Sequence, residues 1–442
     1  MLRNIVIRLS LGGILCGLTV SVTATAYGQM AMDGEARTAE ACLTSLQKYP
    51  AKQAEAAKKA GQQPNYRAYQ KEAKELGKQC AAQFKISDAA GIDLIPLAKL
   101  YLATDQPALA RETINKRLSA TGLTETERAD ALVTAIGVVL SGTPDDASVR
   151  LGEDYVRQMD ALSQAQLKQK IAAHSRIGSY YDYADMDAPN LAHHTAVIKL
   201  IDQLSPGDQK EYGSQRSFAF DTIAHIQANR GQPDRALETL KKAKAENTDP
   251  RLSSMFDDSI NRYSLVGQQA APLRGTYWFN APADTKPLSV AGRVTLIQFT
   301  AHWCGPCRKS YPAMLKFNDL FSSRGLDVVL ATELYGFFED RDNLKPEDEV
   351  AADREYFTGR FKLPFKVAVE PRINFADQTP AGQAARLEFN QSKYHVGGIP
   401  QIMLIDKQGT IRHILIGWDP ANEEIVTKEI DRLLKEPEAK RQ

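Results

Sequence analysis

Cysteine is scarce in this chain, and neither sign of charge dominates it. Five cysteines in 442 residues are too few for a small fold held together by disulfides. The 55 lysines and arginines nearly balance the 54 aspartates and glutamates, so the formal net charge is only +1. Because nucleic-acid-binding proteins usually carry a strong basic excess, we expect no nucleic-acid partner. No apolar run long enough to cross a bilayer follows Val22, which excludes a multi-span membrane protein.

The composition is ordinary for a globular protein. Hydrophobic residues make up 43% of the chain and charged residues 25%, close to the averages for soluble proteins. The length is sufficient for about two or three domains. We predict a multidomain protein in which an all-α domain of helical-hairpin repeats precedes an α/β domain.

Residues 1–26 have the pattern of a secretory signal peptide. Arg3 and Arg8 precede an apolar stretch over Leu9–Val22, and Ala24–Ala26 supplies the small residues of a cleavage site. Export across the inner membrane follows from this pattern, and we expect the mature protein in the periplasm. The alternative is an uncleaved signal that anchors the protein in the membrane.

Residues 27–265 are predicted to form an α-helical domain of repeated hairpins. A helical apolar stripe over 219–226 is followed by Gly231, which can end a helix, and by Pro233, which can begin the next one. Similar breaks recur earlier in the domain, at Pro107, Pro144 and Pro189. Such spacing is typical of stacked hairpins, and an irregular helical bundle is the alternative. The segment 231–240 also shows a weak resemblance to half of a tetratricopeptide repeat.

From residue 266 to residue 437 the pattern indicates a mixed α/β domain. Strands are predicted over 294–300, 326–331 and 365–370, a hairpin over 401–406 and 410–416, and helices over 305–321, 347–361 and 421–434. Residues 438–442 form a polar tail. Because these elements make a complete set, we expect residues 266–442 to fold and act alone.

The strongest motif is Trp303-Cys304-Gly305-Pro306-Cys307, between a predicted strand and a predicted helix. Only a thiolate attacks a disulfide, and the N–H groups at a helix N-terminus stabilise that anion. Cys304 is therefore the predicted nucleophile, and Cys307, one turn further along, is the predicted resolving thiol. Trp303, Gly305 and Pro306 are predicted to support them, the last two by allowing a tight turn into the helix. A zinc site would need further Cys or His ligands, which do not accompany this pair.

With this motif the sequence resembles the thioredoxin family. Pro312 matches the proline that kinks the family's active-site helix, and Gly417 matches the glycine after a late strand. Gly398-Ile399-Pro400 matches the loop whose cis-proline faces the catalytic disulfide. The resemblance implies that Ile399 and Pro400 contact an extended substrate. By its length the domain is similar to the secreted TlpA-type members of the family.

Two departures from that family concern acid–base chemistry. Gln298 stands where thioredoxin has a buried acid, and Ser310 stands where TlpA-type reductases often have one. A carboxylate at either position would relay protons to and from Cys307. Without it, His302 or Glu333 is predicted to serve as the proton relay.

The remaining candidate residues lie in the helical domain. In an oxidising compartment Cys42 and Cys80 are predicted to form a structural disulfide between two antiparallel helices, with a second redox pair as the alternative. His193 and His194 are isolated on a helix, so no metal site is assigned.

Together these features predict an extracytoplasmic thiol–disulfide oxidoreductase with no cofactor beyond the Cys304–Cys307 disulfide. The Cys-Gly-Pro-Cys tetrapeptide favours reduction, with disulfide-containing client proteins as substrates and an electron-donating partner that could be membrane-bound. One alternative is a scaffold whose helical domain recruits a protein partner. Another is a peroxiredoxin-like peroxidase, although Ile297 and Ala301 stand where its activating Pro and Thr or Ser would be.

Overall fold

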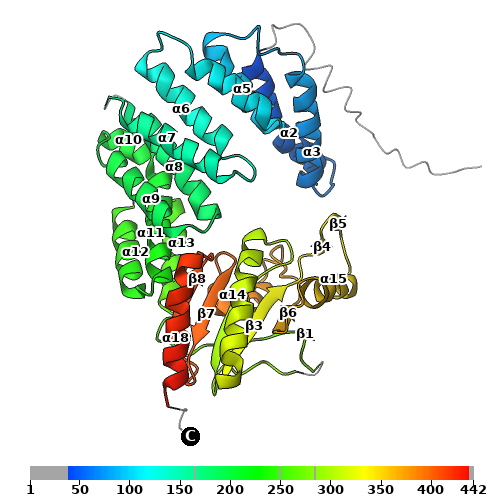
Figure 1. Cartoon of the computed structure of the whole chain (residues 1–442). Helices are drawn as coiled ribbons and strands as arrows, with labels where there is room; N and C mark the ends of the chain where they lie inside the picture. Colours follow the sequence, from blue (N-terminus) through cyan, green and yellow to red (C-terminus); the bar gives the residue numbers. More distant parts are fainter. Residues whose placement is uncertain (1–37, 164–165, 248–249, 283–284, 438–442) are drawn as a thin grey trace, which may run out of the picture. The chain divides into compact units, whose positions relative to one another are not determined.

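The structure, a computed structural model, describes residues 38–163, 166–247, 250–282 and 285–437 (Figure 1). The predicted signal peptide and the polar tail lie outside the described residues. The chain divides into two compact units, residues 1–123 and residues 124–442. No helix in the described ranges is both long enough and apolar enough to cross a membrane.

The first unit is helical throughout most of its described part. Thr38 caps the first helix, since its side chain accepts a hydrogen bond from the Ala41 N–H at 3.1 Å. A disulfide ties the first helix to the second through Cys42 and Cys80, whose Cα atoms are 6.3 Å apart. The helices are α2 (Ala39–Lys59), α3 (Tyr66–Ala81), α4 (Leu94–Ala103) and α5 (Pro107–Leu118).

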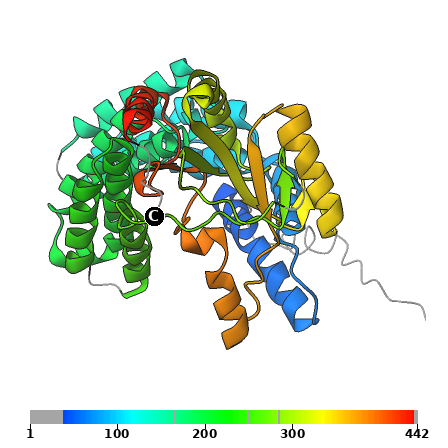
Figure 2. The same ribbon diagram turned by 90° about the horizontal axis from the view of Figure 1, so that it is seen from below.

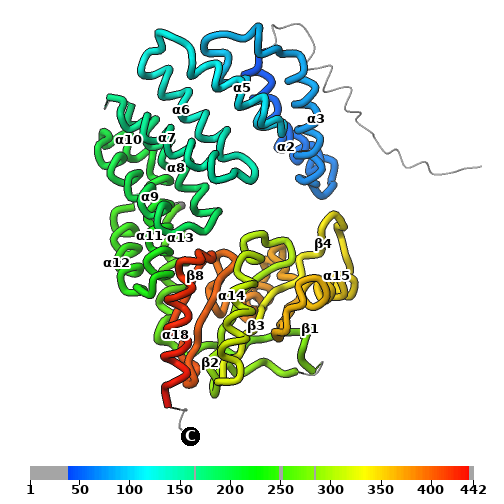
Figure 3. Tube along the Cα trace, viewed as in Figure 1, coloured from blue at the N-terminus to red at the C-terminus, as the bar shows by residue number. Residues whose placement is uncertain are grey.

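The second unit begins with helices that pack as successive pairs, which can be followed along the trace in Figure 3. The helices α6 and α7 form one pair, α8 and α9 the next, and α11 and α12 a third. The bounds are α6 (Glu125–Val139), α7 (Asp146–Asp160), α8 (Leu167–Tyr183), α9 (Asp187–Ile201), α10 (Pro206–Glu211), α11 (Gly213–Asn229), α12 (Pro233–Glu246) and α13 (Pro250–Tyr263).

A left-handed residue lies at each of the four predicted breaks, and at the break around Pro144 it is Gly142, with a φ of 68°. Asp105, Asp185 and Gly231 have φ angles of 63°, 56° and 72°, and α5, α9 and α12 each begin two residues later. Glycine adopts this conformation without strain, and aspartate tolerates it better than most residues. Pro107 and Pro233 then occupy the first helical position, where the missing N–H costs no hydrogen bond.

The C-terminal part of the second unit is a mixed α/β domain, as the sequence predicts, and it is built on a six-stranded sheet. The strand order is β1-β6-β3-β2-β7-β8, with β2, β3 and β6 parallel and the other pairings antiparallel. The strands are β1 (Tyr277–Phe279), β2 (Val294–Phe299), β3 (Leu326–Glu333), β6 (Lys366–Glu370), β7 (Gln401–Ile405) and β8 (Ile411–Ile416). A separate short hairpin joins β4 (Phe337–Phe338) to β5 (Arg341–Asp342).

Helices from the same domain cover one face of the sheet. Met314 and Phe317 belong to the same buried cluster as Leu296 of β2 and Ile430 and Leu433 near the C-terminus. The helices of this domain that contribute to the cluster are α14 (Gly305–Phe321) and α18 (Glu423–Lys435), with the π-helical turn η4 (Glu355–Arg360) that follows α15 (Pro346–Arg354). The domain also contains α16 (Pro380–Leu387) and α17 (Asn390–Lys393). The predicted helix over 347–361 is thus an α-helix that widens into the π-helical turn.

The opposite face of the sheet packs against helices from the preceding part of the chain. Ile297, Met403 and Ile414 lie in one buried cluster with Leu240 of α12 and Phe256 of α13. The strands can supply both faces because side chains alternate along a strand with a period of two. Figure 2 shows the green helices α11–α13 beside the sheet.

Hydrogen bonds also fix α11 to the outer edge of the sheet. The buried Asn229 side chain donates to the Ile416 carbonyl and accepts from the Ile416 N–H, both at 2.9 Å. A ring nitrogen of His413 lies 2.9 Å from the Ala228 carbonyl oxygen. The secondary structure changes between Tyr263 and β1, close to the predicted domain boundary at 265/266, but the packing continues across it. This packing argues against the expectation that residues 266–442 fold alone.

Candidate active site

The strand β2 and the helix α14 position the two motif cysteines. Cys304 follows the turn after β2 and forms the N-cap of α14, with φ −76° and ψ 100°. Its Sγ accepts a hydrogen bond from the Cys307 N–H at 3.1 Å. An N–H donor and the positive end of a helix both favour a thiolate at this position once the disulfide is reduced.

The structure holds the pair in the oxidised state, as a Cys304–Cys307 disulfide with Cα atoms 5.3 Å apart. Both sulfurs belong to a small apolar cluster with Ala301, against which Tyr335 and Ile399 pack. Trp303 lies beside this cluster with 47% of its surface exposed. The disulfide is therefore covered by apolar groups, while the Trp303 side chain next to it is partly exposed to solvent.

The predicted proline loop lies against the nucleophile. The Ile399–Pro400 peptide bond is cis, and the Ile399 carbonyl oxygen is 3.7 Å from the Cys304 Sγ. The Gly417 N–H donates to the Pro400 carbonyl at 2.9 Å and so ties the loop to the end of β8. Gly417 has a φ of 74°, and a Cβ there would collide with the Asp185 carboxylate, which makes glycine necessary.

Gln298 and Ser310, the two departures from the family pattern, both donate hydrogen bonds to the same backbone oxygen. The Gln298 Nε2 donates to the Cys307 carbonyl oxygen at 3.3 Å, and the Ser310 hydroxyl donates to the same oxygen at 2.8 Å. Both side chains are fully buried. They hold the first turn of α14 in place but provide no group that can exchange a proton at neutral pH.

Glu333 lies at a small cavity that reaches the active site from the other side. The cavity encloses about 50 Å³ and is lined by Glu333, Glu370, Tyr335 and Ile399 among others. Glu333 and Glu370 are direct neighbours on the parallel strands β3 and β6. Burial, together with the nearby Glu370 charge, raises the pKa of Glu333 to about 7. Burial also raises the pKa of Glu370 to about 7. Sequence inspection missed Glu370, because only strand pairing brings the two acids together.

This raised pKa makes stability depend on pH. Glu333 binds a proton more tightly in the folded chain than in the unfolded chain, whose pKa is near 4.5. The stabilisation that the tighter proton binding of Glu333 gives the folded protein is therefore complete below pH 4.5, and it is lost as pH rises through about 7. Glutamine does not ionise, so the variant does not lose this stabilisation. We expect the free energy of unfolding of Glu333→Gln, relative to that of the wild type, to increase by roughly 2 kcal/mol from pH 5 to pH 8.

The measurement is urea unfolding of both proteins at pH 5 and pH 8. Glu238→Gln, which changes an exposed glutamate on α12, is the matched control and should show no such difference. An equal effect of Glu333→Gln at the two pH values would contradict the raised pKa.

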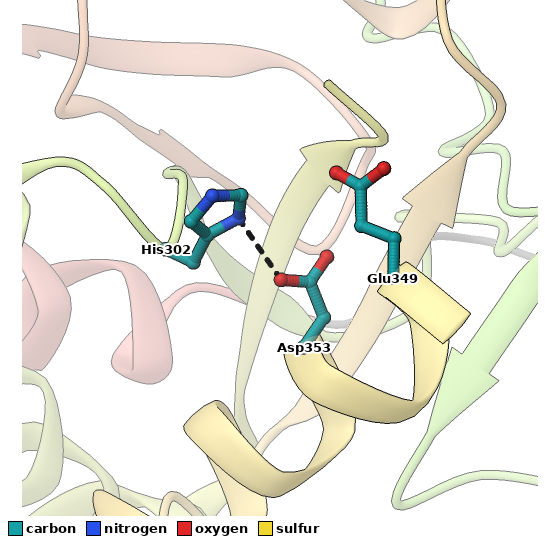
Figure 4. Close-up of side chains that lie close together, drawn as sticks. All are labelled: His302, Glu349 and Asp353. Atoms are coloured by element: carbon teal, nitrogen blue, oxygen red, sulfur yellow. Dashed lines mark ion pairs between the residues drawn. The ribbon is translucent and has the colours of Figure 1, made fainter. Parts of the chain in front are cut away.

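His302, the other predicted relay, is buried and is not among the residues that line this cavity. Its Nδ1 lies 3.0 Å from an oxygen of Asp353 on α15, as Figure 4 shows. Its ring packs 4.8 Å from the Phe338 ring, centroid to centroid. Burial raises the pKa of Asp353, an effect that the nearby His302 opposes. The pair therefore links the active-site loop to α15.

Glu349 completes a buried cluster with these two residues. Ligand atoms of His302, Glu349 and Asp353 lie within 4.8 Å of one another, a set of donors that metal ions can use. The two Glu349 oxygens already accept hydrogen bonds from the Tyr335 and Gly336 N–H groups, at 2.6 and 2.7 Å. Through these two bonds Glu349 joins α15 to the loop after β3. The ring nitrogens of His302 and the carboxylate oxygens of Asp353 are buried and have no hydrogen-bond partner among the described residues. A signal for the cluster exists in the sequence, since Glu349 and Asp353 share one face of a helix.

Comparison with known proteins supports this description of the C-terminal region. Residues 269–430 match the family model described as Redoxin. The thiol–disulfide oxidoreductase ResA of Geobacillus kaustophilus is 25% identical over 126 residues, which are 28% of this chain and 56% of ResA. "Probable nucleoredoxin 1" of Arabidopsis thaliana is 25% identical over 156 residues, 35% of this chain and 22% of that protein. This chain thus spans about half of ResA and less of the plant protein.

Two solved structures are similar to part of this chain at lower identity. StoA from Bacillus subtilis is 22% identical with a TM-score of 0.21, over 31% of this chain and 82% of StoA. A thioredoxin-family thiol:disulfide interchange protein from Chlorobium tepidum is 20% identical with a TM-score of 0.23, over 37% of this chain and 98% of its own. These TM-scores are too low to support an argument, so the fold rests on the strand order and the family match.

Proposed function

We propose, from the premise that residues 269–430 form the redoxin domain of a thiol–disulfide oxidoreductase, that this protein reduces disulfides of client proteins outside the cytoplasm. The observation that carries the proposal is the Cys304–Cys307 disulfide at the start of α14, against the loop that contains Pro400. The proposed export rests on the pattern of residues 1–26, and the direction rests on the Cys-Gly-Pro-Cys tetrapeptide.

The reaction begins with the reduced protein. The Cys304 thiolate attacks one sulfur of the client disulfide, and the other client sulfur leaves as a thiolate that takes up a proton. Cys307 then loses its proton and attacks the Cys304 sulfur, which releases the second client thiol. Two electrons and two protons have passed to the client, and the Cys304–Cys307 disulfide has formed. An electron-donating partner must restore the dithiol before the next turnover.

Glu333 is the proposed acceptor of the proton from Cys307. A pKa of about 7 suits a group that must both accept and return a proton at neutral pH. The cavity beside it has room for a water molecule, which can bridge a carboxylate and the apolar cluster around the disulfide. Ile399 and Tyr335 line that cavity and also pack on the cysteine cluster.

Reduction of insulin disulfides by the purified protein, with dithiothreitol as electron donor, tests this function. We expect a rate well above that of dithiothreitol alone, and a loss on the order of a thousandfold in Cys304→Ser, because a serine hydroxyl does not ionise near neutral pH. The matched control is Cys42→Ser with Cys80→Ser, which removes the other disulfide and should keep the activity. A wild-type rate equal to that of dithiothreitol alone would refute the proposal.

A further inference from the structure

The buried cluster of His302, Glu349 and Asp353 has the donor atoms of a metal site. His302 lies two residues before Cys304, and Glu349 and Asp353 come from successive turns of α15. Figure 4 shows the imidazole and the two carboxylates around one shared space. The three residues are only 4%, 1% and 0% exposed, in that order. The set therefore offers one nitrogen and two carboxylates that are shielded from solvent.

The distances between the donor atoms fit a single ion. One ligand atom from each residue lies within 4.8 Å of the other two, and the His302 Nδ1 is 3.0 Å from an Asp353 oxygen. Two ligands that are each about 2.1 Å from one zinc ion are roughly 3.0–3.4 Å apart. The Nδ1 and the Asp353 oxygen are this close and yet form no hydrogen bond. Two ligands of one ion have this relationship, because their lone pairs point to the ion and not to each other.

Four buried polar atoms of the cluster have no hydrogen-bond partner among the described residues. They are both ring nitrogens of His302 and both carboxylate oxygens of Asp353. The imidazole packs against the rings of Phe337 and Phe338, with centroids 5.2 and 4.8 Å away, and these rings offer no hydrogen bond. Burying polar atoms without partners costs free energy. An ion bound by one ring nitrogen and both Asp353 oxygens would engage three of the four atoms, whereas a simple ion pair engages two.

The charge of the cluster also favours a cation. Glu349 and Asp353 bring two carboxylates into one buried space, and no lysine or arginine in the described part of the chain forms an ion pair with either. Arg308 is engaged elsewhere, since it donates to the His302 carbonyl and to the Tyr356 hydroxyl, both at 3.4 Å. A divalent cation would balance the two carboxylates and leave the imidazole neutral, which is the form that binds metals.

Glu349 is already oriented in the way that metal ligands usually are. Its two oxygens accept hydrogen bonds from the backbone N–H groups of Tyr335 and Gly336. Each carboxylate oxygen has two lone pairs, so each keeps one for an ion. Outer hydrogen bonds of this kind fix the ligands of many protein metal sites. The same loop carries Tyr335, which packs on the cysteine cluster.

We propose that His302, Glu349 and Asp353 bind one divalent transition-metal ion, with zinc as the ion that suits them best. An imidazole ligand favours zinc over Mg²⁺ and Ca²⁺, which take oxygen ligands. The ion would join the segment before Cys304 to α15 and to the loop after β3, and so hold Tyr335 over the disulfide. This structural role goes beyond the proposed function, and it differs from the sequence-based expectation of no cofactor beyond the disulfide.

Zinc uptake by the purified protein, prepared without a metal-binding tag, is the first test. The Cys42–Cys80 and Cys304–Cys307 disulfides are kept closed so that neither pair binds zinc. After dialysis against EDTA, zinc is titrated in competition with a chromophoric chelator. We expect one ion per chain with a Kd below about 1 μM, and no displacement by about a thousandfold excess of Mg²⁺. X-ray absorption at the zinc edge should show nitrogen and oxygen neighbours at about 2.0–2.1 Å and no sulfur at about 2.3 Å.

Asp353→Asn and His302→Gln, made separately, should each weaken zinc binding at least about a hundredfold, because each removes a ligand. Zinc should raise the unfolding temperature of the metal-free wild type by about 5 °C and leave that of both variants unchanged. The matched control is Asp348→Asn, an equal change of charge at an exposed position of the same helix. It should bind zinc as the wild type does.

No zinc uptake by the wild type, sulfur among the neighbours of the zinc, or binding that neither variant weakens would overturn the proposal. Either variant decides the last point if the other fails to fold, and the absorption spectrum is measured on the wild type alone. None of these measurements uses disulfide reduction. Failure of the proposed function would instead appear in the insulin assay, whatever the zinc content.

Discussion

Reduced protein with Cys307 replaced by serine will accumulate covalent complexes with insulin. Cys304 in this variant keeps its place at the N-terminus of α14 and beside the Ile399 carbonyl, so it still attacks the client disulfide. The Cys307 N–H that donates to the Cys304 sulfur belongs to the backbone and survives the substitution. No second thiol is present to release the client, and the mixed disulfide persists. We expect at least about ten times more adduct than in the wild type.

Gel electrophoresis without reducing agent, followed by mass spectrometry of the joined peptides, identifies the cysteine that holds insulin. The reverse variant, Cys304→Ser, should give no adduct, because Cys307 is fully buried and is not the sulfur beside the proline loop. Adducts through Cys307 in that variant, and none in Cys307→Ser, would reverse the assigned roles.

The chemistry of the site was readable from the sequence because it is local. The motif cysteines are separated by a single helical turn, and the strand before them and the helix after them have clear apolar periodicity. The predicted helix over 305–321 matches α14, and the predicted strands agree with β2, β6, β7 and β8 to within a residue or two at each end. Five of the six strands of the sheet, and their order along the chain, were thus accessible to pattern analysis.

What the sequence did not reveal depends on contacts between distant segments. Glu333 was recognised as a candidate, but its neighbour Glu370 becomes visible only when β3 pairs with β6. Likewise the partner of His302 is Asp353, some fifty residues later in the chain. A cleft beside the active site is lined by residues of five helices, α8, α9, α11, α13 and α14, and of the loop that contains Pro400, so no local motif predicts it. Short elements were missed as well, including β1, whose three residues join the sheet edge by pairing with β6.

Domain independence is the point at which sequence and structure diverge most. The change from helical to alternating patterns near residue 266 suggests a boundary, and the secondary structure does change there. Burial does not follow it, since one apolar cluster contains Leu240 and Phe256 of the helices together with Ile297 and Met403 of the sheet. A periodicity reports which face of an element is apolar, but not which part of the chain covers that face.

Residues 266–442 alone should therefore fail to form a stable, soluble domain, whereas residues 124–442 should fold. Without α11–α13 the fragment loses the helix side of the shared cluster and exposes apolar side chains of β8, such as Ile411 and Ile414. Exposing a large apolar side chain costs about 1.5–3 kcal/mol, and several such losses equal the roughly 5–15 kcal/mol that stabilises a typical domain. The Ile416 backbone also loses both hydrogen bonds to Asn229 at the sheet edge, where unpaired groups promote aggregation.

Thermal unfolding followed by near-ultraviolet circular dichroism, with size-exclusion chromatography, compares the two fragments. The longer fragment should unfold cooperatively and elute as a discrete species, while the shorter one should aggregate or lack a transition. A single substitution tests the cause directly. Asn229→Ala within residues 124–442 should lower stability by about 1–3 kcal/mol, because it leaves the partly buried N–H and carbonyl groups of Ile416 without partners. The matched control is Asn261→Ala on α13, a change at an exposed asparagine, which should have little effect. Cooperative unfolding of residues 266–442 at the same temperature as the longer fragment would show that the helices contribute nothing to the sheet domain.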